Sequence, residues 1–174
     1  MADPQQLDSE GPVSIGAGVD EVQFRFRDDE TADHAAVTVD SFLGQTNANA
    51  VRIEPGDDAK ALLPHLDRIA LVEVNFPSFG DGRGLSAARI LREAGYAGEL
   101  RAVGDVLIDQ LWNMRRCGFD SFAPARRLDE ADAEAAFNRW PQVYQPAADD
   151  RVPIWALRHG EGSGGASDAG GADG

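Results

Sequence analysis

Apolar and polar residues alternate near the start of the chain. Val22, Phe24 and Phe26 alternate with polar residues, which predicts a half-exposed strand over 22–27. The pattern of residues 35–43 is compatible with either a short strand or one helical turn. From residue 50 onward, short apolar runs alternate with amphipathic segments of about ten residues.

This rhythm predicts strands and helices in alternation. Strands are expected at 50–55, 68–76, 99–104 and 119–124, and helices at 59–66, 86–96, 106–117 and 128–140. Because 68–76 is almost continuously apolar, we expect it to be covered on both faces, as in a parallel sheet. We expect helix starts at Asp57 or Asp58, Ser86 and Asp105, helix ends at Gly95 and Gly118, and an end or kink at Pro64.

Alternating strands and helices indicate an α/β fold with a small parallel sheet of about four βα units. Such a sheet is either doubly wound or similar to half of a (βα)₈ barrel, and the pattern does not distinguish the two. In both, the loops after the carboxyl ends of the strands form the binding edge. A half-barrel would also expose sheet edges, which a homodimer could cover.

Composition divides the chain into a core and two polar ends. We expect a flexible N-terminus over 1–20, one α/β domain over 21–145 with its most distinctive part at 76–122, and an extension over 146–158. The stretch 159–174 is rich in Gly, Ser and Asp and is expected to be a disordered tail.

Length and residue usage exclude several classes of protein. The chain of 174 residues is within the size of one domain, and its single cysteine, Cys117, allows no internal disulfide. It has neither the apolar run of about 20 residues that spans a bilayer nor the features of a secretion signal. We therefore expect a cytoplasmic protein without a membrane segment.

The net charge of −14 argues against a nucleic-acid partner, because such proteins carry a basic surface. Arginines nevertheless concentrate between residues 76 and 127, the one part of the chain that is not acidic. Individually, such arginines commonly neutralise nearby carboxylates. As a set, they favour a site for a small anion.

The glycine-rich loop 76–86 lies where such a site is expected, after the most buried strand and before a helix. The alternative is a plain turn in which Asp81 and Arg83 bond locally. The loop has the spacing of neither a dinucleotide-binding loop nor a P-loop. Our candidate ligand-binding residues are Asp81, Gly82, Arg83, Gly84, Ser86, Arg101, Gly104, Asp105, Gln110 and Arg116.

Catalytic and metal-binding candidates are fewer. Asp105 and Asp109 could form an acid/base pair on one helix face, although a helix cap and an exposed carboxylate explain them more simply. Cys117, at a predicted helix end, is expected to be a buried, unreactive thiol. The three histidines have no metal-ligand spacing, so no metal is assigned, and no cofactor-binding loop is found.

The segment 76–122 resembles a bacterial family known as domain of unknown function 934. The resemblance rests on F-P-x-F-x-D-G-R-G-x-S-x-A-R-x-L-R, followed by G-E-L-R-A-x-G-D-V, D-Q and R-C-G-F, and extends loosely over 50–145. Genes of this family typically lie beside the gene for the assimilatory sulfite reductase haemoprotein. The resemblance therefore implies an accessory protein, or an oxidoreductase, of sulfite reduction in the cytoplasm.

Three hypotheses follow. The first is an accessory protein that binds a small oxyanion, the sulfite reductase haemoprotein, or both, with Arg83 and Arg101 contacting the anion. The second is a small stand-alone enzyme for a phosphorylated or sulfonated metabolite, with Asp105 or Asp109 as the base. The third is a docking module without catalysis. Whether the chain is an enzyme stays open, and any electron transfer would need a cofactor from another protein.

Overall fold

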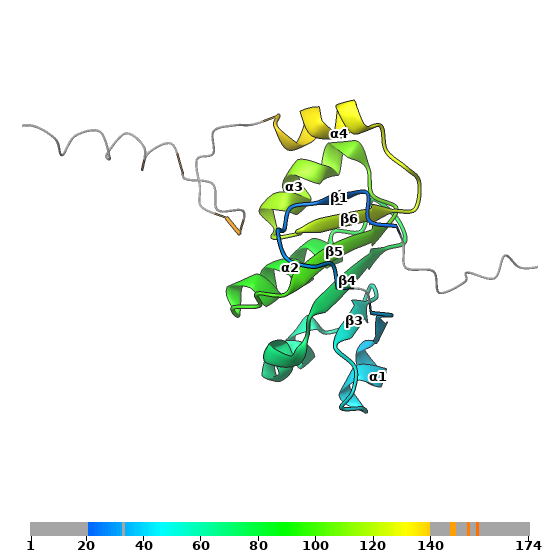
Figure 1. The fold of residues 1–174 in the computed structure, drawn as a ribbon, viewed down its shortest axis with the longest axis vertical. Helices are drawn as coiled ribbons and strands as arrows, with labels where there is room; N and C mark the ends of the chain where they lie inside the picture. The colour runs from blue at the N-terminus through cyan, green and yellow to red at the C-terminus, as the bar shows by residue number, and fades with distance from the viewer. Residues whose placement is uncertain (1–20, 33, 140–146, 149–152, 154–155, 157–174) are drawn as a thin grey trace, which may run out of the picture.

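The computed structural model describes residues 21–32, 34–139, 147, 148, 153 and 156. A six-stranded sheet in the order β1-β6-β5-β4-β3-β2 runs through this part of the chain (Figure 1). The parallel strands are β2 (Val37–Thr38), β3 (Ala50–Ile53), β4 (Leu71–Phe76), β5 (Glu99–Gly104) and β6 (Ser121–Pro124), and β1 (Phe24–Arg25) pairs antiparallel with β6. The α/β class is confirmed, and the sheet is larger than the predicted four units.

Helices follow the parallel strands, and all but the last of them connect one strand to the next. They are α1 (Val39–Leu43), the 3₁₀ helix η1 (Ala59–Arg68), α2 (Arg83–Glu93), the 3₁₀ turn η2 (Ile108–Gln110), α3 (Leu111–Arg116) and α4 (Glu130–Phe137). The ambiguous segment 35–43 contains both of its predicted alternatives, a short strand and then a short helix. Asp58 caps η1 by accepting a hydrogen bond from the Lys60 amide at 3.0 Å, and Pro64 lies inside this helix without ending it.

Two predicted helix starts are wrong. Helix α2 begins at Arg83 with Gly82 as its N-cap, so Ser86 lies inside the helix. Asp105 does not cap the next helix either, because η2 follows Leu107 and α3 covers only the second half of the predicted segment. Gly95 and Gly118 do follow helix ends, with positive φ angles of 91° and 105°, as predicted.

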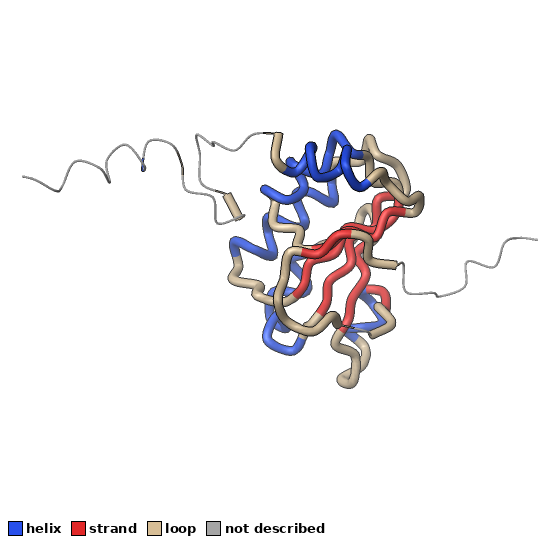
Figure 2. The backbone as a smooth tube through the Cα atoms, turned by 45° about the horizontal axis from the view of Figure 1, so that its top comes forward, coloured by secondary structure: helices blue, strands red, loops and turns tan. Residues whose placement is uncertain are grey.

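The strand order resolves the choice between the two predicted sheets in favour of the half-barrel-like one. From β2 to β6 each strand lies beside the next in sequence, without the reversal that defines a doubly wound sheet. Right-handed crossovers in one direction put every connecting helix on the same face. One apolar core accordingly joins Val72, Leu100 and Phe122 of the strands to Leu91 and Met114 of the helices, and Figure 2 shows the longer helices together beside the strands.

The other face of the sheet has a row of polar residues across its middle, with the buried apolar residues Leu71 and Val103 on either side of it. Six residues, one from each strand, lie directly opposite one another across it: Thr38, Arg52, Glu73, Arg101, Ser121 and Arg25. Opposed residues of neighbouring strands point to the same face, and so does Glu99, two residues before Arg101. We call Arg25, Arg52, Glu73, Glu99, Arg101 and Ser121 the polar row.

Charges of opposite sign alternate along the polar row. Arg52 donates to Glu73 at 2.8 and 2.9 Å, and Arg101 donates to Glu73 at 3.4 Å. Arg101 also donates to Glu99 Oε1 at 2.8 and 3.2 Å, and the Ser121 hydroxyl donates to the same oxygen at 2.6 Å. Arg25 donates twice to Glu99 Oε2 at 3.2 Å. The side chain of Arg101 is 0% exposed, so two carboxylates compensate a fully buried guanidinium.

The start of the described chain is fastened to this sheet on both faces. Gln23 exchanges two hydrogen bonds with the main chain of Leu128, at 2.6 and 2.8 Å, while Phe24 packs edge-on against Phe137. On the polar face, Arg25 donates to three main-chain oxygens of residues 27–30. The chain then crosses from the β1 edge to the β2 edge in front of the sheet (Figure 1).

Three predicted segments lie wholly or mostly outside the described residues. The predicted flexible segment 1–20 and disordered tail 159–174 lie outside the described residues, as does most of the 146–158 extension. Within the described part, helices are all too short or too polar to cross a lipid bilayer.

Replacing Arg101 with methionine should destabilise the protein strongly, because Glu73 and Glu99 would keep their burial and lose the charge between them. We expect a loss of about 3–5 kcal/mol in the free energy of unfolding, measured by urea titration. The matched control is Arg89→Met, whose side chain is exposed on α2 and should leave the urea midpoint almost unchanged. Equal midpoints for the two variants would show that the polar row contributes no stability.

Ser121→Ala should make the protein more sensitive to acid. Burial raises the pKa of Glu99, but hydrogen bonds from Ser121 and Arg101 outweigh it and hold this pKa below its ordinary value. A carboxylate of lowered pKa stabilises the fold above its unfolded-state pKa, and this contribution is lost as the pH falls through the folded-state pKa. Without the hydroxyl, acid unfolding followed by circular dichroism should begin at a higher pH, while the exposed control Ser86→Ala should match the unaltered protein.

Candidate functional site

The carboxyl ends of β4, β5 and β6 meet at one edge of the sheet, and the chain after each strand is tied to its neighbour. The Asp105 amide donates to the Phe76 carbonyl at 2.6 Å, and the Ala125 amide donates to the Gly104 carbonyl at 2.8 Å. We call this edge, with the loops 77–82, 105–107 and 125–129, the C-terminal edge. It is the place where the sequence predicts a binding site.

Two side chains hold the glycine-rich loop at this edge. Asp105 accepts a hydrogen bond from the Phe79 amide at 3.1 Å, and the Gln110 side chain donates to the Phe79 carbonyl at 2.6 Å. Both main-chain groups of Phe79 are therefore fixed, while 55% of its surface is exposed to solvent. The loop holds an aromatic ring outward from the fold.

Gly84 and Gly104 have structural reasons for being glycine. A Cβ atom on Gly84 would lie 2.7 Å from the Phe76 ring, so the missing side chain lets α2 approach β4. Gly104 has a φ of 95°, and its Cβ would lie 2.4 Å from the Phe76 carbonyl oxygen. Both shape the C-terminal edge through packing. Around Gly82, by contrast, the space for a Cβ is open.

Arg83 lies at the C-terminal edge and pairs with Asp81 in the same loop. Its guanidinium donates to both carboxylate oxygens, with the shortest distance at 2.6 Å, although 67% of the side chain is exposed. The hydrogen bonds from Arg83 lower the pKa of Asp81 to about 2. This is the local turn that the sequence offers as the alternative to an anion site.

Arg101 is not part of this edge, and the prediction that it contacts an anion together with Arg83 is wrong. Its side chain points to the polar face, where Glu73 and Glu99 surround it and no surface remains for a ligand. Ser86 lies inside α2 and is exposed. Contrary to the prediction, it does not cap the helix.

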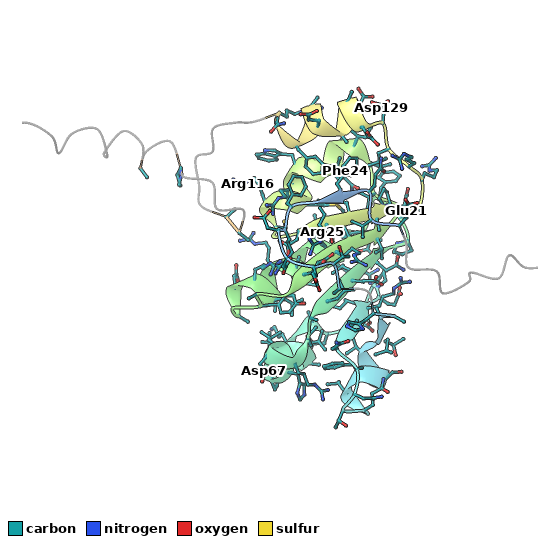
Figure 3. All side chains as sticks on the ribbon, viewed as in Figure 1. Glu21, Phe24, Arg25, Asp67, Arg116 and Asp129 are labelled. Atoms are coloured by element: carbon teal, nitrogen blue, oxygen red, sulfur yellow. The ribbon has the colours of Figure 1, made fainter. Side chains whose placement is uncertain are left out.

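Arg116 lies at the other end of the sheet. A helix that connects parallel strands runs back along the sheet, so the last residue of α3 is near the amino ends of the strands. Figure 3 labels Arg116 there, away from the strand arrowheads. It borders a pocket with Arg89, Arg92 and Cys117. Of the predicted edge residues, 80–86 and 104–110 therefore share an edge, whereas Arg101 and 115–117 do not join them.

The two catalytic candidates are also separated in role. Asp105 lies before η2 and holds the Phe79 loop, with Arg126 3.7 Å from its other oxygen. Asp109 is 82% exposed and pairs with Arg139 of the chain after α4 at 3.4 Å. Contrary to the prediction, Asp105 and Asp109 do not share a helix face, because the helix starts after Asp105.

A small cavity lies beside Arg83, where β3 and β4 end. The space between Glu54, Asn75, Arg83 and Gly84 measures about 20 Å³, which is room for about one water molecule. Ligand sites for small molecules usually measure roughly 300–1,000 Å³. Among the described residues, no three His, Cys, Asp or Glu side chains gather as metal ligands do.

The site residue that sequence reasoning missed is Phe79. The sequence did contain a signal for Phe79: it is a large apolar residue in a loop rich in Ser, Gly and Asp, and the loop was not predicted to pack into the core. Cys117 agrees better with expectation. It is half-buried, and burial raises the pKa of its thiol against the opposing influence of Arg89 and Arg116.

Removing the Asp105 carboxylate should loosen the loop without unfolding the protein. In Asp105→Ala, we expect the Phe79 amide to exchange its hydrogen about fivefold faster, the equivalent of one hydrogen bond worth about 1 kcal/mol. Hydrogen exchange read by NMR measures this directly. Asp109→Ala removes a carboxylate four residues away and should leave the rate unchanged, and equal rates in both variants would contradict the role given to Asp105.

The chain was compared with curated proteins, with solved structures and with protein-family models. Searches of curated proteins and of solved structures returned no significant match. A family model described as "bacterial protein of unknown function (DUF934)" matches residues 50–155, from β3 through the C-terminal edge and α4. The match covers more than half of the chain and includes every predicted site residue, and the protein therefore belongs to the DUF934 family.

Proposed function

We propose that this protein is an accessory protein of assimilatory sulfite reduction that docks on the sulfite reductase haemoprotein through its C-terminal edge. The pathway, the partner and the cytoplasmic location come from the resemblance described for 76–122. The docking mode comes from the site. The observation that carries it is Phe79, an exposed aromatic ring whose main chain is fixed by Asp105 and Gln110.

A fixed aromatic residue suits a docking surface because little conformational entropy is lost when a partner covers it. Binding energy at interfaces concentrates in a few residues, often aromatic residues and arginines. Around Phe79, Arg83 and Arg126 are largely exposed, and each pairs with a carboxylate of the same edge. Such pairs form a polar rim around Phe79. Because each arginine is paired with a carboxylate, the rim suits a partner surface that has no large net charge.

The stand-alone enzyme is supported less well by this geometry. General acid/base chemistry needs a group held beside a substrate in a partly closed site. The cavity beside Arg83 holds about one water molecule, and Asp109 faces bulk solvent. Docking needs neither an enclosed cavity nor a catalytic pair.

Binding of the purified haemoprotein to the immobilised full chain tests the proposal. Phe79→Ser should weaken the measured Kd at least about tenfold, equivalent to about 1.4 kcal/mol. Leu43→Ser is the matched control, because Leu43 is another large apolar residue that is exposed, at the end of α1. Circular dichroism confirms that both variants fold.

Two outcomes would overturn the proposal. If the unaltered chain shows no saturable binding to the haemoprotein, the partner is wrong. If Phe79→Ser and Leu43→Ser bind as tightly as the unaltered chain, the C-terminal edge is not the docking surface.

A further inference from the structure

A second surface feature lies at the amino-terminal side of the sheet, between α2 and α3. It is a pocket of about 490 Å³ lined by Arg89, Arg92, Glu93, Asn113, Arg116 and Cys117, with Ala147 and Ala148 at its border. The Ala148 amide donates to the Arg116 carbonyl at 3.3 Å, which brings this part of the later chain against the pocket. The pocket is separate from the C-terminal edge.

Helix spacing brings the polar groups of the pocket together. Arg89 and Arg92 are three residues apart on α2, and Asn113 and Arg116 are three apart on α3, so each pair lies on one helix face. The guanidinium of Arg116 lies 5.4 Å from the centre of the Trp112 ring. The two helices thus offer guanidinium and amide donors to the same space.

The charges of the pocket are unusual for this protein. Of the described residues, three arginines and one glutamate line it, in a chain whose net charge is −14. Arg92 is used by the fold, since it donates to the carbonyls of Tyr96, Gly98 and Gly118 and pairs with Asp120. Within the described part of the chain, Arg89 pairs with the exposed Glu93 at 3.6 Å, and 66% of the Arg89 side chain is exposed.

Arginines in a folded chain often serve only to bond main-chain carbonyls. That explanation accounts for Arg92, whose acceptors are the carbonyls of Tyr96, Gly98 and Gly118. It does not account for Arg89, which lies inside α2, four residues before its end. Arg89 pairs with Glu93 one helical turn later and also lines the pocket beside the half-buried Cys117.

The cationic groups of both helices influence Cys117. Burial raises the pKa of the Cys117 thiol, while the positive charges of Arg89 and Arg116 act in the opposite direction. Both guanidinium groups therefore act electrostatically on the same sulfur atom, one from each helix. A negatively charged group beside Cys117 would be near both.

We propose that the pocket between α2 and α3 binds a small tetrahedral oxyanion, held by Arg89 and Arg116, with Asn113 as a further donor. Arginine suits this role because its planar donors match two oxygens of a phosphate or sulfate group. The volume is within the range of small-molecule sites and exceeds what a bare ion needs. The oxyanion is either free or carried on a small metabolite. The proposal is independent of docking through Phe79.

The single cysteine of the chain makes the test specific, because an alkylating reagent reports on Cys117 alone. The folded full chain is treated with iodoacetamide, an uncharged reagent, in inorganic sulfate, inorganic phosphate or phosphoserine. Chloride of equal ionic strength is the reference. A bound oxyanion covers the thiol and disfavours its thiolate form, so alkylation should slow at least about threefold in a saturable manner.

Arg89→Gln is the test variant and Arg83→Gln the matched control, since both arginines are exposed and lie on the same helix. The protection is expressed as the ratio of rates with and without the oxyanion, which removes the direct influence of Arg89 on the thiol. We expect protection to be lost in Arg89→Gln and kept in Arg83→Gln. Protection by phosphoserine alone would support the proposal and assign the oxyanion to a metabolite.

Absence of protection by all three probes in the unaltered chain would overturn the proposal, and so would equal protection in Arg89→Gln. Neither result would touch the docking proposal, because Arg89→Gln should bind the haemoprotein as the unaltered chain does.

Discussion

The buried guanidinium of Arg101 is the constraint around which this sheet is organised. Removing an arginine from water costs several kcal/mol unless opposite charges compensate it. Here Glu73 from the neighbouring strand β4 and Glu99 from the same strand β5 provide those charges. Each of these carboxylates has a second arginine nearer to solvent, Arg52 or Arg25. The compensation therefore extends across the sheet and links β3, β4, β5 and β1 in one register.

This arrangement follows from the order of the strands. In a sheet whose helices all lie on one face, the opposite face has no helix layer to make it apolar. In this protein, polar side chains and the crossing segment after β1 occupy that face. The two ends of the sheet remain for function, and they differ: one presents a fixed aromatic ring, and the other presents arginines around a thiol.

The alternation of apolar runs with amphipathic segments was sufficient to predict the class of fold and the approximate positions of most elements. It did not predict the polar row, although a signal was present. Glu73 interrupts the apolar run of β4, and Glu99 and Arg101 alternate with Leu100 and Ala102 in β5. Which of these charges meet depends on the register between strands, and no local pattern contains that information.

Prediction of the site residues was limited in the same way. Loop 76–86 and residues 104–110 were correctly assigned to one edge, because the carboxyl ends of parallel strands meet there. Arg101 and Arg116 were assigned to it from charge alone. Whether a side chain reaches an edge depends on its face in the strand and on the direction of its helix, so one proved buried and the other distant.

The attachment of β1 has a practical consequence. The family match begins at residue 50, but Arg25 compensates Glu99, Gln23 holds Leu128, and Phe24 covers Phe137. A fragment cut at the family boundary would leave a buried carboxylate short of charge and would uncover the edge of β6, a surface on which other chains can pair. The described residues upstream of the family match belong to the folding unit, and fragments for expression should begin no later than residue 21.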